Sequence, residues 1–158
     1  MKILKADLSY QNVFENLMQL YLYDLSIYTG DSVDQNGLFD LGRYFSLYWS
    51  DQDRYPYLCI INDTPVGFAL VRQLTTDSYA ICEFFILRSF RRKGIATQFA
   101  HDIFNLHNGK WQVAEIESNT PSQDFWRKTI SDFTGNDFLE EWSNSQPKGP
   151  KQVFSSVT

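Results

Sequence analysis

Apolar and polar residues along this chain follow patterns that predict alternating strands and helices. Residues 2–8 are expected to form a short strand. A long amphipathic helix should follow from Ser9 as N-cap, because apolar residues then recur every third or fourth position. These positions are Val13, Phe14, Leu17, Met18, Tyr21, Leu25 and Tyr28. The stretch 29–53 is polar with scattered aromatic residues, which predicts a loop and a second, shorter helix.

Three strands are predicted close together in the middle of the chain. The segments YPYLCII, VGFALVRQL and YAICEFFIL are joined by short turns, which is the pattern of an antiparallel meander. A helix is expected to start at Gly94 and to end near Gly109, followed by a strand in WQVAEIES.

A second helix signal and two further strands complete the pattern. Thr120, Pro121 and Gln123 have the spacing of a capping box with Thr120 as N-cap, and strands are expected around 137–142 and 151–157. The order of elements mixes hairpins with one strand–helix–strand crossover. We therefore predict an α/β (α+β) fold in a single domain over residues 1–158.

Composition and charge narrow the possible partners. The chain has 158 residues, of which 43% are hydrophobic, and its net charge is -5, which argues against a nucleic acid as partner. Cys59 and Cys82 each lie in an apolar run and are interpreted as buried free thiols in a reducing compartment. No metal-ligand spacing, signal peptide or membrane-spanning run is recognisable, so we expect a cytoplasmic protein without a metal.

A cluster of three cations stands at the start of the helix expected after YAICEFFIL. Arg91, Arg92 and Lys93 precede Gly94, although the positive end of a helix dipole normally attracts acidic residues. One interpretation is a solvated basic turn. The other is a phosphate site, because exposed backbone N–H groups next to small residues such as Gly94 and Ala96 bind anions.

The segment R-x-x-G-x-A from Arg91 to Ala96 resembles the coenzyme A signature of the GNAT superfamily of N-acetyltransferases. The longer segment EFFILRSFRRKGIATQFA resembles the fourth strand and following helix of that family. Asn119 after the next strand, followed by Phe125 and Trp126, adds to the resemblance, which extends over essentially the whole chain. It implies a mixed, mostly antiparallel sheet of about seven strands flanked by about four helices.

The resemblance also implies a site for acetyl-CoA as acyl donor. The residues expected to contact it are Phe85, Ile86, Arg91, Arg92, Lys93, Gly94, Ile95, Ala96, Thr97, Asn119, Phe125 and Trp126. The main chain near Phe85 and Ile86 should polarise the thioester carbonyl. Trp126 departs from the family pattern, because many members carry there a tyrosine that protonates the thiolate, and an indole N–H cannot do so.

Glu83 is the candidate general base. It interrupts the apolar run of a central strand, where burial should raise the pKa of a carboxylate toward neutrality. Alternation places it on the same face as Phe85. The alternatives are a structural carboxylate paired with Arg72, Arg88 or a tyrosine, or a carboxylate that faces solvent.

The acceptor is expected to be a primary amine on a small molecule or a protein. Residues 24–53 contain six aspartates (24, 31, 34, 40, 51 and 53) and one arginine, which indicates either a solvated acidic loop or a rim that attracts a cationic amine. A non-catalytic acyl-CoA-binding sensor or regulatory module of the same fold is the alternative function, and a protein-interaction domain is a third. A monomer and a homodimer are both compatible with the sequence.

Overall fold

The computed structural model describes residues 1–157 and contains one continuous seven-stranded sheet. Its strands and α-helices run in the order β1 (Lys2–Lys5), α1 (Gln11–Thr29), β2 (Arg54–Ile61), β3 (Thr64–Thr75), β4 (Ser78–Ile86), α2 (Ile95–Leu106), β5 (Lys110–Ala114), α3 (Thr120–Thr134), β6 (Phe138–Ser143) and β7 (Gly149–Ser155). Three short 3-10 helices are added, η1 (Leu8–Tyr10), η2 (Phe45–Trp49) and η3 (Arg88–Phe90).

The sheet has the strand order β1-β2-β3-β4-β5-β7-β6. Only β4 and β5 pair in parallel, and every other neighbouring pair is antiparallel. The predicted mixed α/β fold with a mostly antiparallel sheet is therefore confirmed. The helix count is slightly different, because residues 1–157 contain three α-helices and the second, shorter helix expected within 29–53 is the five-residue η2.

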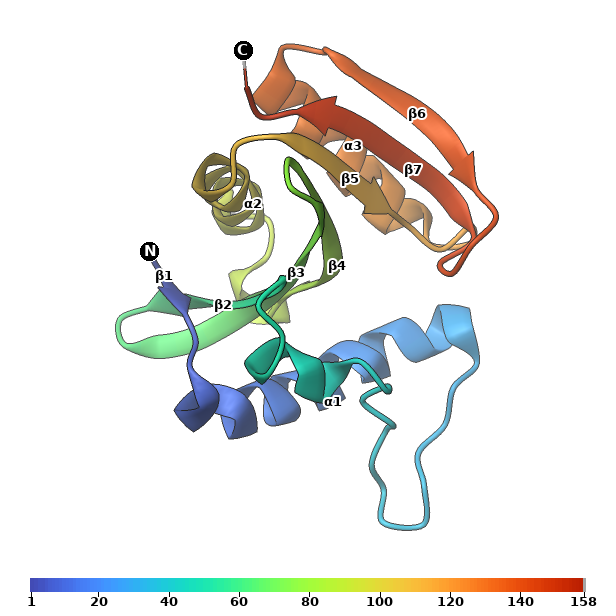
Figure 1. Ribbon diagram of the computed structural model, residues 1–158. Coiled ribbons are helices and arrows are strands. Elements are labelled where there is room, and N and C mark those ends of the chain that lie inside the picture. The colour runs from blue at the N-terminus through green and yellow to red at the C-terminus, as the bar shows by residue number, and fades with distance from the viewer. Residues whose placement is uncertain (158) are drawn as a thin grey trace.

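The two faces of the sheet carry separate apolar clusters. On one face, α2 and α3 pack Phe99, Ile103 and Ile130 against the sheet, and on the other α1 and η2 contribute Phe14 and Phe45. Figure 1 shows α1 below the strands and α3 behind β5 and β7. Burial of these large side chains supplies most of the driving force for the fold. No helix within residues 1–157 is long and apolar enough to cross a membrane.

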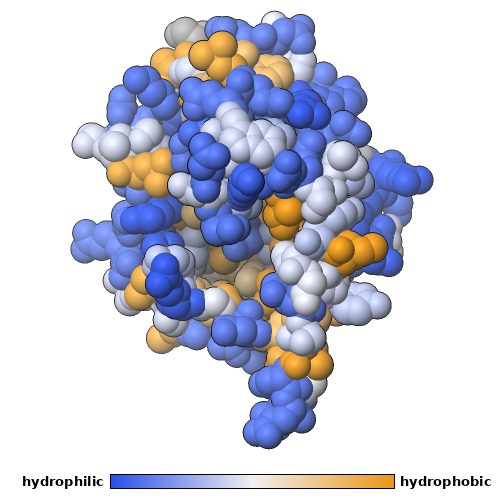
Figure 2. Space-filling model, turned by 90° about the vertical axis from the view of Figure 1, so that its right-hand side faces the viewer, coloured by the Kyte–Doolittle hydropathy of each residue, from blue (hydrophilic) through white to orange (hydrophobic). Residues whose placement is uncertain are grey.

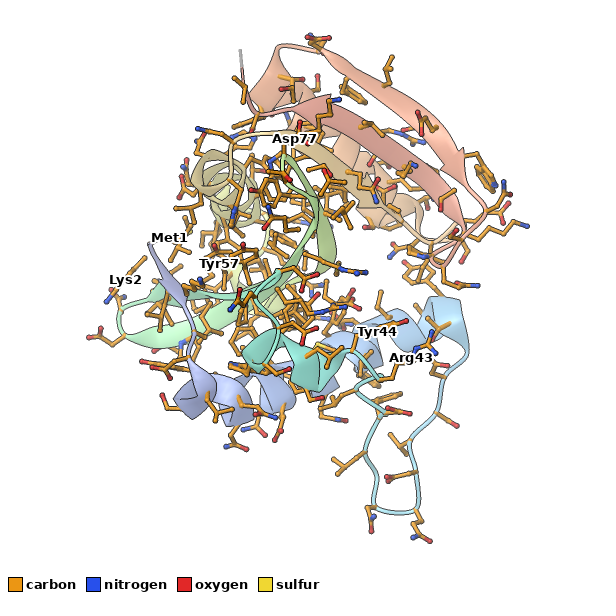
Figure 3. The ribbon with its side chains drawn as sticks, viewed as in Figure 1. Met1, Lys2, Arg43, Tyr44, Tyr57 and Asp77 are labelled. Carbon is orange, nitrogen blue, oxygen red and sulfur yellow. The ribbon has the colours of Figure 1, made fainter. Side chains whose placement is uncertain are left out.

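The parallel pair β4–β5 is the feature that positions the site. Its register runs only from Ser78↔Lys110 to Ile81↔Val113, and the remaining half of β4 has no partner on that side. Figure 3 labels Asp77 at the paired end, where its carbonyl accepts a hydrogen bond from the Lys110 backbone N–H at 2.8 Å. We call the opening between β4 and β5 beyond Ile81 and Val113 the fork.

Several element ends differ from the sequence-based prediction for identifiable reasons. The first helical turn is η1, whose N-cap is Asp7, so the expectation that Ser9 caps α1 is wrong; Ser9 instead donates its backbone N–H to Asp7 Oδ1 at 2.9 Å. Asn119, not Thr120, is the N-cap of α3, and its side chain accepts from the Ser122 backbone N–H at 3.2 Å.

The cysteines are both free, but they lie in different environments. Cys59 is buried as predicted, whereas Cys82 is exposed. The register between β3 and β4 shifts at Leu70 and Val71 and leaves Cys82 without a paired residue, which is a β-bulge. The bulge explains why the apolar context of Cys82 misled the prediction.

Candidate active site

The basic turn, residues 91–94, connects the end of β4 to α2 through backbone of left-handed conformation. Arg92 has φ +58° and Gly94, the N-cap of α2, has φ +78°. A Cβ at Gly94 would meet no protein atom within 4 Å, so the glycine serves the backbone conformation and leaves open space outside. The first turn of α2 has no acidic residue and no side-chain cap, which leaves its N–H groups available to an anion.

The three cations of the basic turn have different surroundings. The Arg91 side chain is exposed, but its guanidinium is engaged by the protein, with Nη2 at 2.6 Å from Asp24 Oδ2 and Nε at 2.7 Å from the Ile86 carbonyl. Arg92 and Lys93 are exposed and form no salt bridge within the part of the chain that the structure describes. All three cations are exposed, and among the described residues Arg92 and Lys93 are the two that no carboxylate engages.

Asp24 is the aspartate of the stretch 24–53 whose partners the sequence did not indicate. The sequence left open a solvated acidic loop or an acidic rim for that stretch, whereas Asp24 lies on α1 and accepts hydrogen bonds from both Arg88 and Arg91 at 2.7 and 2.6 Å. Partial burial tends to raise the pKa of Asp24, but the bonds to Arg91 and Arg88 outweigh it and lower the pKa. Because 64 and 67 residues separate the partners in sequence, no local pattern could have indicated this contact.

The other residues expected at the coenzyme site surround the basic turn and the fork. Phe85 and Ile86 are buried at the end of β4 that pairs with β3 but not with β5, and they lie on opposite faces of the sheet. Ile95, Ala96 and Thr97 form the first turn of α2 and are partly buried. The end of β4 and the start of α2 together place the backbone of these five residues at the fork.

Asn119, Phe125 and Trp126 lie across the fork on α3. Phe125 is partly exposed and stacks on Phe84 with 5.9 Å between ring centroids. Trp126 is only 5% exposed and packs edge-on against Phe84 at 4.9 Å. Trp126 is thus mainly a core residue, and Phe125 offers the more accessible ring.

Glu83 lies on the α1 face of β4, as alternation with Phe85 predicts. Its Oε2 accepts a hydrogen bond from the Tyr21 hydroxyl at 2.6 Å. Burial raises the pKa of Glu83 to about 7, although the bond from Tyr21 acts in the opposite direction. The sequence offered Arg72, Arg88 or a tyrosine as a structural partner of Glu83, and the structure shows a tyrosine, Tyr21.

The fork opens toward one side of the molecule. Figure 2 shows this side hollowed between an upper part, formed by β5, β7 and β6, and a lower part with the protruding loop 30–44. Apolar atoms lie at the bottom of the hollow. Figure 3 labels Arg43 and Tyr44 where the loop returns toward the sheet.

A separate cavity of about 420 Å³ lies between α3 and the strands β6 and β7. Arg127, Glu140 and Trp142 line it, and none of the predicted site residues does. Beneath it, Gln152 donates to both Glu115 and Glu140, at 3.2 and 3.0 Å. Since none of the predicted site residues lines this cavity, we place the candidate active site at the fork.

Comparison with known proteins agrees with the fold and shows the family. The sequence matches the profile of the acetyltransferase (GNAT) family over residues 16–130. The chain therefore belongs to the GNAT family of acetyltransferases. As predicted, it is a GNAT-type N-acetyltransferase. No curated protein sequence matches it.

Solved structures with the same fold include three acetyltransferases in complex with coenzyme A. The PaiA N-acetyltransferase of Thermoplasma acidophilum has a TM-score of 0.69 at 10% identity, covering 98% of both chains. The spermidine N-acetyltransferase of Vibrio cholerae, in complex with coenzyme A and spermine, has a TM-score of 0.66 at 10% identity, covering 98% of this chain and 95% of that one. The aminoglycoside acetyltransferase AAC(6')-Ib has a TM-score of 0.66 at 15% identity, covering 98% and 94%.

Proposed function

We propose that residues 1–158 form one domain that transfers an acetyl group from acetyl-CoA to a primary amine. The observation that carries this proposal is the basic turn. The uncapped N-terminus of α2, the left-handed Gly94 and three exposed cations come together beside the fork, and two of these cations form no salt bridge among the described residues. Such a terminus is a ready site for the pyrophosphate of coenzyme A. Coenzyme A in the related structures supports this assignment.

The fork suits the rest of the donor. Backbone groups of β4 beyond Ile81 have no partner on β5, so an extended pantetheine arm can pair with them. In this arrangement the thioester lies near Phe85 and Ile86, and Phe125 contacts the arm. Asn119, Thr97 and Trp126 complete the coenzyme side of the proposed site.

The acceptor amine is proposed to enter from the hollow and to meet Glu83. A carboxylate with a pKa of about 7 is matched to the removal of a proton from an ammonium group near neutral pH. We propose a cationic acceptor, because loop 30–44 retains Asp31, Asp34 and Asp40 against Arg43. Spermine and aminoglycosides, the amines of two related proteins, are both polycations, which supports the same class.

The experiment that tests the proposal is a panel of amines assayed by release of free coenzyme A thiol. We expect release from acetyl-CoA to depend on a primary amine and to be highest for cationic amines such as polyamines. The same thiol release separates an enzyme from a module that only binds acyl-CoA. Tight binding of acetyl-CoA with no amine-dependent release across the panel would contradict the proposed transfer.

A further inference from the structure

Glu83 is held by a single tyrosine from a distant part of the chain. Tyr21 lies on α1, and its hydroxyl is 2.6 Å from Glu83 Oε2. The ring is fixed by two aromatic neighbours, standing edge-on to Phe68 at 5.6 Å and tilted against Phe85 at 5.8 Å. Because Phe68 and Phe85 belong to the buried core, the position of the hydroxyl is set by packing between α1 and the sheet.

The two oxygens of the Glu83 carboxylate have different environments. Oε2 is occupied by Tyr21, whereas Oε1 has no hydrogen-bond partner among residues 1–157 and is not fully enclosed. A carboxylate bound on one oxygen only is restrained in orientation and keeps one free acceptor. This is the arrangement that a base needs if it is to take a proton from an incoming ammonium group.

No other charged side chain competes for Glu83 in the described structure. The neighbouring ionisable group on β4 is the Cys82 thiol, and the groups that act on Cys82 are Tyr48 from η2, Arg54 from β2 and Arg72 from β3. Burial and the Glu83 carboxylate together raise the pKa of Tyr21 well above its usual value, so the phenol keeps its proton. Tyr21 therefore acts on Glu83 as a permanent hydrogen-bond donor.

We propose that Tyr21 is a positioning residue for acetyl transfer: it holds Glu83 Oε2 so that Oε1 faces the acceptor. This inference rests on the proposed function. An acceptor ammonium gives its proton to Oε1, the free amine attacks the thioester carbonyl, and the carbon–sulfur bond breaks. The new carbon–nitrogen bond becomes an amide when the nitrogen loses its second proton to the departing thiolate, directly or through solvent, and Glu83 returns its proton to solvent.

The test is the pH–rate profile of Tyr21→Phe, measured with saturating acetyl-CoA and the best amine of the panel. Loss of a hydrogen bond to a charged group should move the acidic limb upward by about one to two pH units. The rate at pH 6.5 should then fall at least about tenfold, while above the shifted limb it should recover to within about threefold of the wild type. The Michaelis constant for acetyl-CoA should be unchanged.

Two controls separate positioning from a general structural effect. Tyr23→Phe removes a hydroxyl from the same helix at a ring that is 65% exposed, and should leave the profile unchanged. In a Glu83→Gln background, Tyr21→Phe should change the rate less than about twofold, because residues that act as one unit are not additive.

The outcomes that would overturn the inference are specific. A Tyr21→Phe enzyme with an unshifted acidic limb, or one whose loss is the same at every pH and adds to that of Glu83→Gln, would show that Tyr21 only packs. If Glu83→Gln alone keeps the rate and the limb, Glu83 is not the base and the inference fails. Amine-dependent thiol release by the wild type would still support the proposed function in that case.

Discussion

Glu83 is buried, and its hydrogen-bond partner, the Tyr21 hydroxyl, is a neutral donor that does not cancel the charge of the carboxylate. Its pKa of about 7 means that the carboxylate gains its charge, and hence its ability to accept a proton, as pH rises through neutrality. We expect Glu83→Gln to lower kcat by two to four decades, the usual contribution of a general base, and to remove the acidic limb of the profile. Steady-state rates from pH 5.5 to 9.5 measure both effects.

A matched control for this substitution is Glu117→Gln, which changes an exposed carboxylate after β5. It should keep both the rate and the limb. A loss of only a few-fold in Glu83→Gln, with the limb still present, would return Glu83 to a structural role.

Glu115 is a second buried carboxylate, and it should affect stability instead of rate. Burial raises its pKa to about 8, and its Oε1 has no hydrogen-bond partner. The folded chain therefore binds a proton here that the unfolded chain, with a pKa near 4.5, has released. The free energy of unfolding should fall as pH rises from about 5 to 8.

Glu115→Gln should weaken that pH dependence and raise the free energy of unfolding at pH 9 by roughly 1–3 kcal/mol. Urea denaturation at pH 5, 7 and 9 measures it, with Glu117→Gln again as the control. An unchanged slope between pH 5 and 8 would show that Glu115 is ionised in the folded protein.

At the scale of elements, the basic turn depends on the conformation of one glycine. Gly94→Asp places a negative charge and a side chain in the space proposed for the pyrophosphate, at a backbone angle that L-residues rarely adopt. Acetyl-CoA affinity measured by calorimetry should fall about 10- to 100-fold, the equivalent of losing one or two charge-assisted hydrogen bonds.

Gly135→Asp is the matched control, because Gly135 also has a left-handed φ of +66° with no atom near a Cβ, but it ends α3. It should have a similar effect on folding and none on affinity. Unchanged acetyl-CoA binding by a folded Gly94→Asp protein would exclude the basic turn as the phosphate site.

The elements themselves were largely predictable, because their apolar periodicity is strong. The meander of β2, β3 and β4 and the start of α2 follow directly from that periodicity. Element ends were less predictable, because they depend on tertiary pairing: β5 ends at Ala114, one residue beyond its last pair with β4, although WQVAEIES continues in a strand-like pattern. Long-range contacts such as Tyr21–Glu83 leave no local signal at all.

For the whole molecule, the acidic loop is the feature that should govern acceptor choice. Asp24, Asp51 and Asp53 each form salt bridges with arginines, so the unneutralised charge is concentrated in loop 30–44. Asp34 and Asp40 also accept hydrogen bonds from loop backbone, at Asn36 and Gly42. Substitution by asparagine keeps those acceptors and removes only the charge.

We expect the triple variant of Asp31, Asp34 and Asp40 to asparagine to raise the Michaelis constant of a cationic acceptor about 3- to 10-fold at low salt. The effect should largely disappear in about 1 M salt, where charges are screened within about 3 Å. The constant for acetyl-CoA should not change. The control is Asp63→Asn in the turn between β2 and β3, which removes one negative charge elsewhere and should leave the Michaelis constant of the acceptor unchanged. A wild-type enzyme that prefers a neutral acceptor over every cationic one would contradict the prediction.

Asp24 joins the two halves of the proposed site through one side chain. It belongs to α1, which carries Tyr21 toward the acceptor side, and it holds Arg91 of the basic turn at 2.6 Å. We expect this contact to couple the two substrates, and any such coupling is reciprocal: the factor by which bound coenzyme changes acceptor affinity equals the factor by which bound acceptor changes coenzyme affinity. Asp24→Asn weakens the salt bridge to Arg91. Both coupling factors, that of coenzyme on acceptor affinity and that of acceptor on coenzyme affinity, should then move toward one by the same amount, whichever substrate is added first.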